Sequence, residues 1–172
     1  ISFQIFSNIH LQKKHNMASF HTMVFKNKRV LIRVDFNVPI SDKNQVSDDS
    51  RIRAALPTIY AILKAGGRII LMSHLGRPDG ERKLKYSLEP VAKHLSNLLE
   101  MEVILAEDCI GEDVVKLSWS LNDNQILMLE NLRFYKEETE GNSDFAEKLA
   151  QLGDIYVNDA FGTAHRAHAS TA

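Results

Sequence analysis

Polar side chains follow directly after four apolar segments of this chain, and their types are those that bind anions and hydroxyl groups. They occur in Arg33-Val-Asp-Phe-Asn-Val-Pro39, Ser73-His-Leu-Gly-Arg-Pro78, Glu130-Asn-Leu-Arg-Phe134 and Asn158-Asp-Ala-Phe-Gly162. A guanidinium group binds phosphate or carboxylate with a planar, two-pronged fork and stays charged across the useful pH range. Because ligands of open α/β sheets bind outside the carboxyl ends of the strands, the four segments predict one cation-rich site. Its ligand is expected to be small, multiply anionic and hydroxylated.

Five of the nine arginines lie in or beside these junctions, namely Arg33, Arg51, Arg77, Arg133 and Arg166. A single arginine would be expected to solvate the surface or form a weak ion pair. Five at equivalent positions instead favour a shared anion site. Arg51 falls in the first turn of a predicted helix, where the macrodipole disfavours a cation. Either a bound anion or the neighbouring Asp48 and Asp49 would offset its charge, and both interpretations stay open.

His74 lies three residues before Arg77 and also has two interpretations. It either donates a hydrogen bond to an oxyanion or acts as an acid/base near neutral pH, or it is a structural histidine. Asp35 and Asn37 either bind a hydroxylated ligand or form the turn before Pro39. The other polar strand ends favour the ligand for these two residues.

Other reactive residue types point to no further chemistry. His165 and His168 flank Arg166, but we expect no metal there, because a zinc site needs a third ligand at a recognisable spacing. No base can be placed near Cys109, which is therefore expected to be a small buried or half-buried side chain. Neither G-x-x-x-x-G-K-S/T nor G-x-G-x-x-G occurs, so the chain carries no nucleotide-binding fingerprint of its own.

The overall composition, with 44% hydrophobic and 25% charged residues in a chain of 172, is that of a globular protein. The formal net charge of -1 argues against a nucleic-acid binder, which usually has a strong basic excess. A single cysteine excludes an internal disulfide and fits a reducing compartment. No apolar run approaches the roughly 20 residues that cross a bilayer.

The first 28 residues are unusual, because no Asp or Glu occurs before Asp35 and position 1 is not methionine. A transit-like leader also lacks acidic residues, although it is usually rich in Arg and Ser. Translated upstream sequence or a ragged fragment end, with the natural start at Met17 or Met23, is favoured. The reason is that this stretch has Lys13 and Lys14 but no arginine.

Apolar runs alternate with amphipathic segments along the rest of the chain. Strands are expected over residues 30–32, 69–72, 103–105, 126–129 and 155–157. Helices are expected from the N-cap cluster at residues 48–50 to the glycines at 66–67, from near residue 87, over 109–121, and after residues 142–143. Short strands that are apolar on both faces and separated by helices predict a parallel sheet covered on each side.

The four motifs, together with Val157-Asn-Asp-Ala-Phe-Gly-Thr-Ala-His-Arg-Ala-His168, occur in the order typical of phosphoglycerate kinases. From about Phe25 to Ala172 the chain resembles the N-terminal domain of that family. The resemblance implies a parallel, Rossmann-like three-layer α/β domain that holds the phosphoglycerate. It also implies a separate C-terminal domain that binds Mg-ATP or Mg-ADP. The family's reaction is reversible phosphoryl transfer between ATP and 3-phosphoglycerate, giving ADP and 1,3-bisphosphoglycerate, in glycolysis, gluconeogenesis or carbon fixation.

The resemblance also implies roles for individual residues. Arg51 would be the catalytic residue, approaching the reacting carboxyl and the phosphoryl group in flight. Asp35 and Asn37 would contact the glycerate hydroxyl and carboxyl with His74 nearby, and three further arginines would bind the 3-phosphate. The implied substrate-binding set is Asp35, Phe36, Asn37, Arg51, His74, Leu75, Gly76, Arg77, Arg133 and Arg166. Arg33 would belong to the surrounding basic patch, and no metal or cofactor ligand is expected in this chain.

The expected organisation is a leader-like or untranslated-region-derived extension over residues 1–24, followed by an incomplete phosphoglycerate-binding domain over 25–172. The chain stops at Ala172 directly after a site-like segment, so we expect a truncated chain without the nucleotide domain and without activity of its own. A non-catalytic phospholigand sensor is the alternative, and such a sensor should end with a closed fold.

The expected partners are 3-phosphoglycerate and 1,3-bisphosphoglycerate, with no nucleic acid and no membrane, and the protein is expected to be a monomer. The connection between Phe134 and Gly153 is short, as in bacterial and plastid-like members of the family. That feature leaves the compartment open, with the cytoplasm expected and a plastid as the alternative.

Overall fold

The computed structural model describes residues 22–160, 162 and 166–171, so the predicted N-terminal extension lies almost entirely outside the described residues. Five strands form one parallel sheet in the order β3-β4-β2-β1-β5. They are β1 (Arg29–Arg33), β2 (Arg68–Met72), β3 (Glu102–Leu105), β4 (Gln125–Met128) and β5 (Ile155–Asn158). Each lies within one or two residues of a predicted apolar run, which confirms the parallel α/β sheet.

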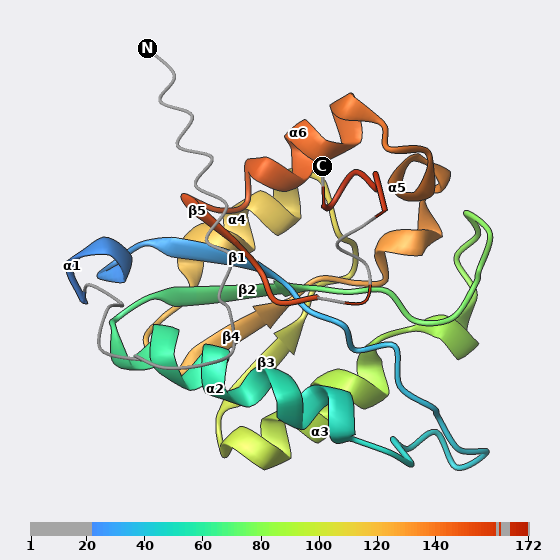
Figure 1. The fold of residues 1–172 in the computed structure, drawn as a ribbon, viewed down its shortest axis with the longest axis horizontal. Coiled ribbons are helices and arrows are strands. Elements are labelled where there is room, and N and C mark those ends of the chain that lie inside the picture. Colours follow the sequence, from blue (N-terminus) through green and yellow to red (C-terminus); the bar gives the residue numbers. More distant parts are fainter. Residues whose placement is uncertain (1–21, 161, 163–165, 172) are drawn as a thin grey trace.

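Helices cover both faces of the sheet, which gives the predicted three layers (Figure 1). One face is covered by α2 (Ser50–Lys64) and α3 (Glu89–Leu99), and the other by α4 (Glu112–Ser120) and α6 (Ser143–Ala150). The shorter elements are α1 (Thr22–Phe25), η2 (Leu84–Tyr86), η3 (Leu132–Phe134) and α5 (Lys136–Glu140).

The sheet separates two apolar clusters, and alternation along β1 shows how they form. Val30 and Ile32 are buried on the face covered by α2 and α3, whereas Leu31 packs into the cluster that includes residues of α4 and α6. The three central residues of β1 are therefore buried on alternate faces and read as a continuous apolar run, and the flanking Arg29 and Arg33 are buried as well. The polar side chains of the four motifs lie at or directly after the ends of strands of this sheet.

Two local features differ from the sequence-based expectation. Asp49 is the N-cap residue of α2, but its carboxylate pairs with Arg53 at 3.0 Å and with His94 Nε2 of α3 at 2.8 Å instead of capping the helix. The neighbouring Asp48 Oδ1 accepts from the backbone N–H of Ser50 at 2.9 Å. Asp49 thus ties two helices together. The short helix α5 was not predicted, since its sequence Lys-Glu-Glu-Thr-Glu has no apolar period.

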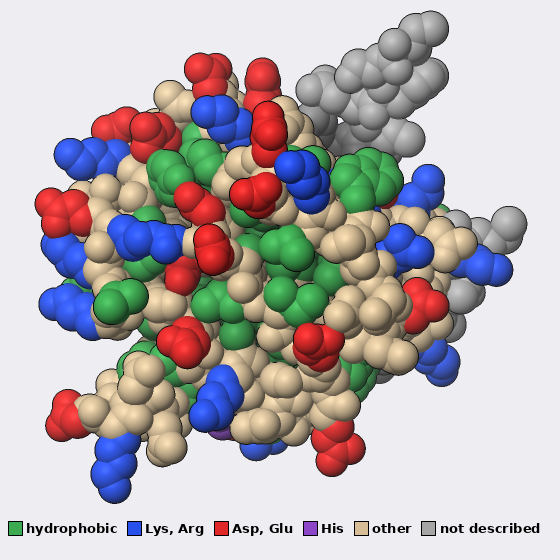
Figure 2. All heavy atoms as spheres, turned by 180° about the vertical axis from the view of Figure 1, so that it is seen from behind, with side chains coloured by type: hydrophobic (Ala, Val, Ile, Leu, Met, Phe, Trp, Pro, Cys, Tyr) green, Lys and Arg blue, Asp and Glu red, His purple; other side chains and the backbone are tan. Residues whose placement is uncertain are grey.

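The described part of the rear face carries acidic and basic side chains interspersed with apolar ones (Figure 2). No sign of charge dominates it, in keeping with the formal net charge of -1. No helix among the described residues is long and apolar enough to cross a membrane.

Candidate functional site

The four polar strand ends lie side by side at one edge of the sheet. They follow β4, β2, β1 and β5, which are four consecutive neighbours in the sheet, and all the strands are parallel. Their carboxyl ends therefore share one edge, and segments separated by more than a hundred residues in sequence converge there (Figure 1). This is the edge at which open α/β sheets bind ligands.

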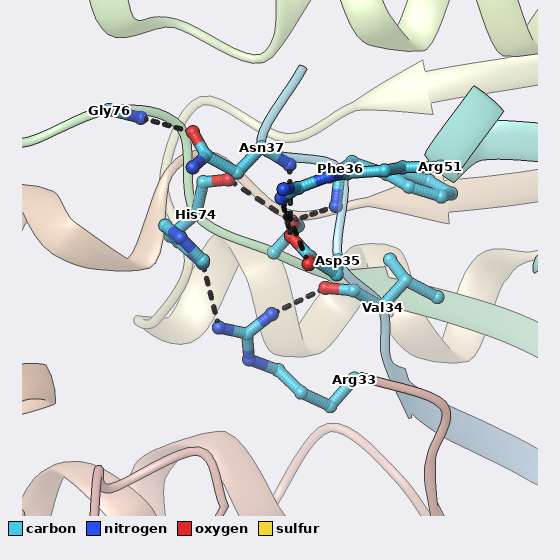
Figure 3. Close-up of polar contacts among 9 residues, drawn as sticks. Arg33, Val34, Asp35, Phe36, Asn37, Arg51, His74 and Gly76 are labelled. Atoms are coloured by element: carbon cyan, nitrogen blue, oxygen red, sulfur yellow. Dashed lines mark hydrogen bonds and ion pairs between the residues drawn. The ribbon is translucent and has the colours of Figure 1, made fainter. Parts of the chain in front are cut away.

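Asp35 and Arg51 meet where the chain leaves β1 (Figure 3). Nη1 of Arg51, in the first turn of α2, lies 3.1 and 3.0 Å from the two carboxylate oxygens of Asp35. The Arg51 side chain is 53% exposed, so this is an open ion pair. Both explanations for a cation at this helix start stay open, because hydrogen bonds from Ser50 lower the pKa of Asp48 and the charge of Arg51 lowers it further. Asp49, in contrast, is engaged in another ion pair.

The loop after β2 is fastened to the segment after β1. Oδ1 of Asn37 accepts a hydrogen bond of 2.8 Å from the backbone N–H of Gly76 (Figure 3). The Asn37 side-chain nitrogen makes no hydrogen bond with a described residue, so it can donate to a ligand. Gly76 has a positive φ of 62°, and a Cβ there would lie 2.5 Å from the ring of Tyr86, so only glycine fits.

Asn131 holds the same loop from the other side, a role that the sequence analysis did not assign. Its side-chain nitrogen donates to the carbonyls of Leu75 at 2.7 Å and Tyr86 at 2.9 Å, and its oxygen accepts from the backbone N–H of Arg133 at 3.0 Å. Asn131 is fully buried, with its polar atoms turned toward backbone groups. Its place directly before the Leu-Arg-Phe motif was the signal available in the sequence.

Glu130 positions the N-terminal end of α3. It accepts hydrogen bonds from the hydroxyl of Ser87 at 2.7 Å and from the backbone N–H of Leu88 at 2.9 Å. A carboxylate at a helix start satisfies unpaired N–H groups and complements the helix dipole. Glu130 therefore stabilises the start of α3, although it lies in the same motif as Arg133.

Three of the predicted arginines come together in a pocket of about 220 Å³. It is lined by Arg77, Asp79, Gly80, Arg133, Thr139, Arg166 and His168. Nη1 of Arg133 donates to the carbonyl of Gly76 at 3.0 Å, and Gly76 is bound to Asn37. The arginine pocket and the group around Asn37 are therefore joined through one residue.

The electrostatics of the pocket favour an anion. Burial lowers the pKa of Arg133, and the nearby positive charges of Arg166 and Arg77 lower it further. None of the three arginines forms an ion pair with a carboxylate among the described residues. The buried Nε of Arg133 and Nδ1 of His168 also make no hydrogen bond with a described residue. Such unmatched cations and polar atoms suit a phosphate.

Beneath the pocket, Arg33 and His74 are both buried, with Arg33 fully so. Nη2 of Arg33 lies 3.0 Å from Nδ1 of His74, and the same guanidinium also bonds to the carbonyl of Val34 (Figure 3). Burial and the charge of Arg33 lower the pKa of His74 to about 2. His74 is therefore a neutral side chain at neutral pH.

Phe36 and Leu75, also in the predicted substrate-binding set, are buried. Phe36 meets the β2 loop through its backbone N–H, which donates to Ser73 Oγ at 3.0 Å.

The remaining predicted residues lie away from this arrangement or outside the described residues. His165 is not described, so the pair flanking Arg166 is seen only through His168. Cys109 is fully buried, and burial together with Asp108 raises the pKa of its thiol, which confirms an inert side chain. Among residues 22–160, 162 and 166–171, no three His, Cys, Asp or Glu side chains are grouped so as to hold a metal ion.

Comparisons with known proteins show the family of this chain. The family model described as phosphoglycerate kinase matches residues 20–172. The phosphoglycerate kinase of Borrelia hermsii is 59% identical over 148 residues, which are 86% of this chain and 38% of that protein. The cytosolic phosphoglycerate kinase of Triticum aestivum is 52% identical over 158 residues, or 92% of this chain and 39% of the relative.

Solved structures give the same result. The phosphoglycerate kinase of Coxiella burnetii superposes with a TM-score of 0.74 at 42% identity and covers 86% of this chain, while the chain covers 36% of it. That of Pyrococcus horikoshii gives a TM-score of 0.73 at 35% identity, with 85% and 37% covered. The chain spans less than half the length of these relatives. A match across nearly all of its own length nevertheless shows that this chain belongs to the phosphoglycerate kinase family.

Proposed function

We propose that residues 25–172 form the phosphoglycerate-binding part of a phosphoglycerate kinase, which transfers a phosphoryl group between ATP and 3-phosphoglycerate. The observation that carries this proposal is the pocket in which Arg77, Arg133 and Arg166 converge without a carboxylate partner among the described residues. A phosphate has the charge and the oxygen geometry to bind several guanidinium groups at once.

The glycerate part of the ligand, away from the phosphate, is proposed to lie beside Asp35, Asn37 and His74. Gly76 joins Asn37 to the pocket, so a phosphate held by Arg133 leaves the rest of a three-carbon molecule near Asn37 and Asp35. The free amide of Asn37 donates to a carboxylate or hydroxyl oxygen, while the carboxylate of Asp35 accepts from a hydroxyl. His74 adds an uncharged donor beside them.

Arg51 is the proposed catalytic residue. Its present partner is Asp35 in an open ion pair, and exposed pairs of this kind are worth at most about 1 kcal/mol. Releasing Arg51 toward a reacting carboxyl or phosphoryl group therefore costs little. A guanidinium that reaches the developing charge stabilises the transition state more than the bound substrate.

The nucleotide is proposed to bind as Mg-ATP or Mg-ADP outside residues 25–172, because these residues contain neither of the common phosphate-loop fingerprints. The 172-residue chain alone is then expected to show no phosphoryl transfer, since only one reactant is positioned. Turnover above background by the purified chain would contradict this division of labour. We also propose that the protein is a monomer and lies in the cytoplasm.

The test is calorimetric titration of a full-length phosphoglycerate kinase that carries this chain as its N-terminal part. We expect 3-phosphoglycerate to bind, and D-glycerate, which lacks the phosphate, to bind far more weakly. Arg77→Ala and Arg166→Ala should remove most of that difference, whereas Arg53→Ala, an exposed arginine paired with Asp49, should keep it. Equal affinity for both ligands in the unsubstituted protein would reject the pocket as a phosphate site.

A further inference from the structure

A buried chain of contacts runs from α5 to the candidate site, and its two charged members are fully buried. Glu138 of α5 and Arg33 at the end of β1 are both 0% exposed. They do not touch directly. Ser170 Oγ lies 2.9 Å from Nε of Arg33 and 2.5 Å from Oε1 of Glu138, so the serine hydroxyl connects them.

The donor and the acceptor of each hydrogen bond between Glu138, Ser170, Arg33 and His74 follow from their chemistry. A guanidinium can only donate, so Ser170 Oγ accepts from Arg33 and must give its own proton to the Glu138 carboxylate. At the other end of the guanidinium, Nη2 faces Nδ1 of His74 at 3.0 Å. Because Arg33 has no acceptor atom, Nδ1 must accept. A neutral His74 therefore carries its proton on Nε2.

This tautomer leaves a donor for the candidate site. Nε2 of His74 makes no hydrogen bond with a described residue, so its proton is available to a ligand oxygen. The charged and titratable groups that act on His74 are Arg33 of β1, Arg133 of η3, and Arg166 and His168 of the C-terminal segment, and all of them disfavour a charged imidazole. Such a histidine supplies a directed donor without adding another charge to the arginine cluster.

Glu138 also fastens the segment that carries Arg166 and His168. Its Oε2 accepts from the backbone N–H of Ser170 at 3.0 Å, and its carbonyl accepts from the backbone N–H of Ala169 at 2.9 Å. Glu138 thus contacts Arg33 through Ser170 and directly binds the C-terminal segment that supplies two pocket residues.

We propose that Glu138 is a positioning residue of this site, acting through Ser170 and Arg33 to hold His74 as the Nε2-protonated donor toward the ligand. The proposal rests on the proposed function only for the identity of the ligand. A purely structural buried pair would be expected to affect stability alone. The two roles separate when the protonation of His74 is observed directly.

The experiment uses a full-length phosphoglycerate kinase that carries this chain, with Glu138→Gln and Ser170→Ala as the test variants. Glu140→Gln is the matched control, because Glu140 is exposed on the same short helix. Long-range proton–nitrogen NMR of the histidine rings identifies which nitrogen of His74 is protonated at pH 6. Calorimetry with 3-phosphoglycerate gives the affinity, and thermal unfolding confirms that each variant is folded at the measuring temperature.

We expect the unsubstituted protein and Glu140→Gln to show a neutral, Nε2-protonated His74. Both test variants should shift the ring toward mixed tautomers or the charged form and lose about tenfold in affinity, as expected when one directed hydrogen bond to a charged ligand is lost. A charged or Nδ1-protonated ring in the unsubstituted protein overturns the proposal, even where a variant fails to fold. Folded variants that keep the tautomer overturn it too, whatever their affinity.

A changed ring with unchanged affinity is equally contrary to a positioning role. Failure of the unsubstituted protein to bind 3-phosphoglycerate would instead reject the proposed function. The NMR result does not depend on the ligand, so the two failures are distinguishable.

Discussion

β1 carries an arginine at each end, and the two are partnered in opposite ways. At the amino end, Nη2 of Arg29 lies 3.0 Å from Asp154 Oδ1, Nη1 donates to Ser118 Oγ and the Gln151 carbonyl at 3.0 Å each, and the guanidinium stacks on Trp119 at 3.7 Å. At the carboxyl end, Arg33 contacts no carboxylate of a described residue directly. Its charge is matched through Ser170, and it faces a neutral histidine.

The same asymmetry extends to the two edges of the sheet. Around Arg29, a direct carboxylate partner matches the charge of the guanidinium. Around the carboxyl edge, Arg77, Arg133 and Arg166 lack such partners among the described residues, and Arg51 has only an open one. An arginine at a strand end therefore becomes informative about function only when its partners are known. Unmatched charge, rather than arginine itself, distinguishes the candidate site.

The largest expected effect is the loss of turnover on substitution of Arg51. In a full-length kinase carrying this chain, Arg51→Ala should lower the turnover number by about 10²–10³, because it removes a preorganised donor to developing charge. Arg51→Lys should rescue poorly, since a point charge does not reproduce the guanidinium fork. Steady-state kinetics would measure both, with Arg53→Ala, two residues along α2, as the control. A normal turnover number with only a raised Michaelis constant would make Arg51 an ordinary binding residue.

Substitution of Arg29, at the amino end of β1, should lower stability and leave ligand binding unchanged. Arg29→Met breaks a largely buried ion pair and is expected to destabilise the fold by roughly 3 kcal/mol. Affinity for 3-phosphoglycerate should hardly change in the fraction that stays folded. Chemical denaturation and calorimetry at a temperature well below unfolding would establish this. If Arg29→Met weakened the ligand as much as a pocket variant, the distinction between the two edges would fail.

A smaller loss, in the free energy of phosphoglycerate binding, is expected on substitution of the pocket arginines. Arg77→Ala and Arg166→Ala each remove charge-assisted hydrogen bonds worth about 1.5–3 kcal/mol of phosphoglycerate binding, with ATP affinity unaltered. Both side chains are exposed, so folding should be little disturbed. Arg133→Ala is less clean, because it also removes the bond to the Gly76 carbonyl. Titration of each ligand separately would decide the matter, and unchanged phosphoglycerate affinity in all three variants would refute the assignment.

The two edges should also respond to acid in different pH ranges. The pKa of His74 falls from its ordinary 6.5 to about 2 in the folded protein. Stability from the neutral ring is complete above pH 6.5 and is lost as pH falls, by up to about 1.4 kcal/mol per pH unit. Burial alone would raise the pKa of Asp154, but hydrogen bonds from Arg29 outweigh it and lower that pKa below 3.8. The stability from that pair is therefore lost only below pH 3.8.

Denaturant titrations at several pH values would separate these contributions. His74→Gln should flatten the decline in stability between pH 6.5 and about 4, whereas Asp154→Asn should flatten it only below that range. An unaltered decline in His74→Gln would show that the histidine is charged in the folded protein.

The fold could be predicted where buried segments have a recognisable apolar pattern in the sequence. All five strand cores were predicted, because parallel strands covered on both faces are apolar throughout. The strand ends were extended by charged residues such as Arg29 and Glu102, which the apolar pattern cannot show. The helix α5 was missed, since its buried residue is Glu138, and only a partner elsewhere in the chain explains that burial.

The sequence singled out residues that the structure brings together at the carboxyl edge, but it did not show which groups pair with them. Residues such as Arg77 and Arg133 stand out because they follow apolar runs, whereas the pairing of Arg51 with Asp35 depends on how α2 packs. Arg33 was assigned to a surrounding basic patch, and its burial beneath His74 is a tertiary fact that no local spacing encodes. The roles of individual residues toward the ligand remain predictions.

The central claim is that unmatched arginines at the carboxyl edge bind the phosphate of 3-phosphoglycerate. A crystal structure of a full-length kinase carrying this chain, soaked with 3-phosphoglycerate, tests it most directly. We expect phosphate oxygens within hydrogen-bonding distance of the guanidinium groups of Arg77, Arg133 and Arg166, with the hydroxyl and carboxyl directed toward Asp35 and Asn37. Phosphate density elsewhere, or a reversed ligand with its carboxylate in the arginine pocket, would contradict it.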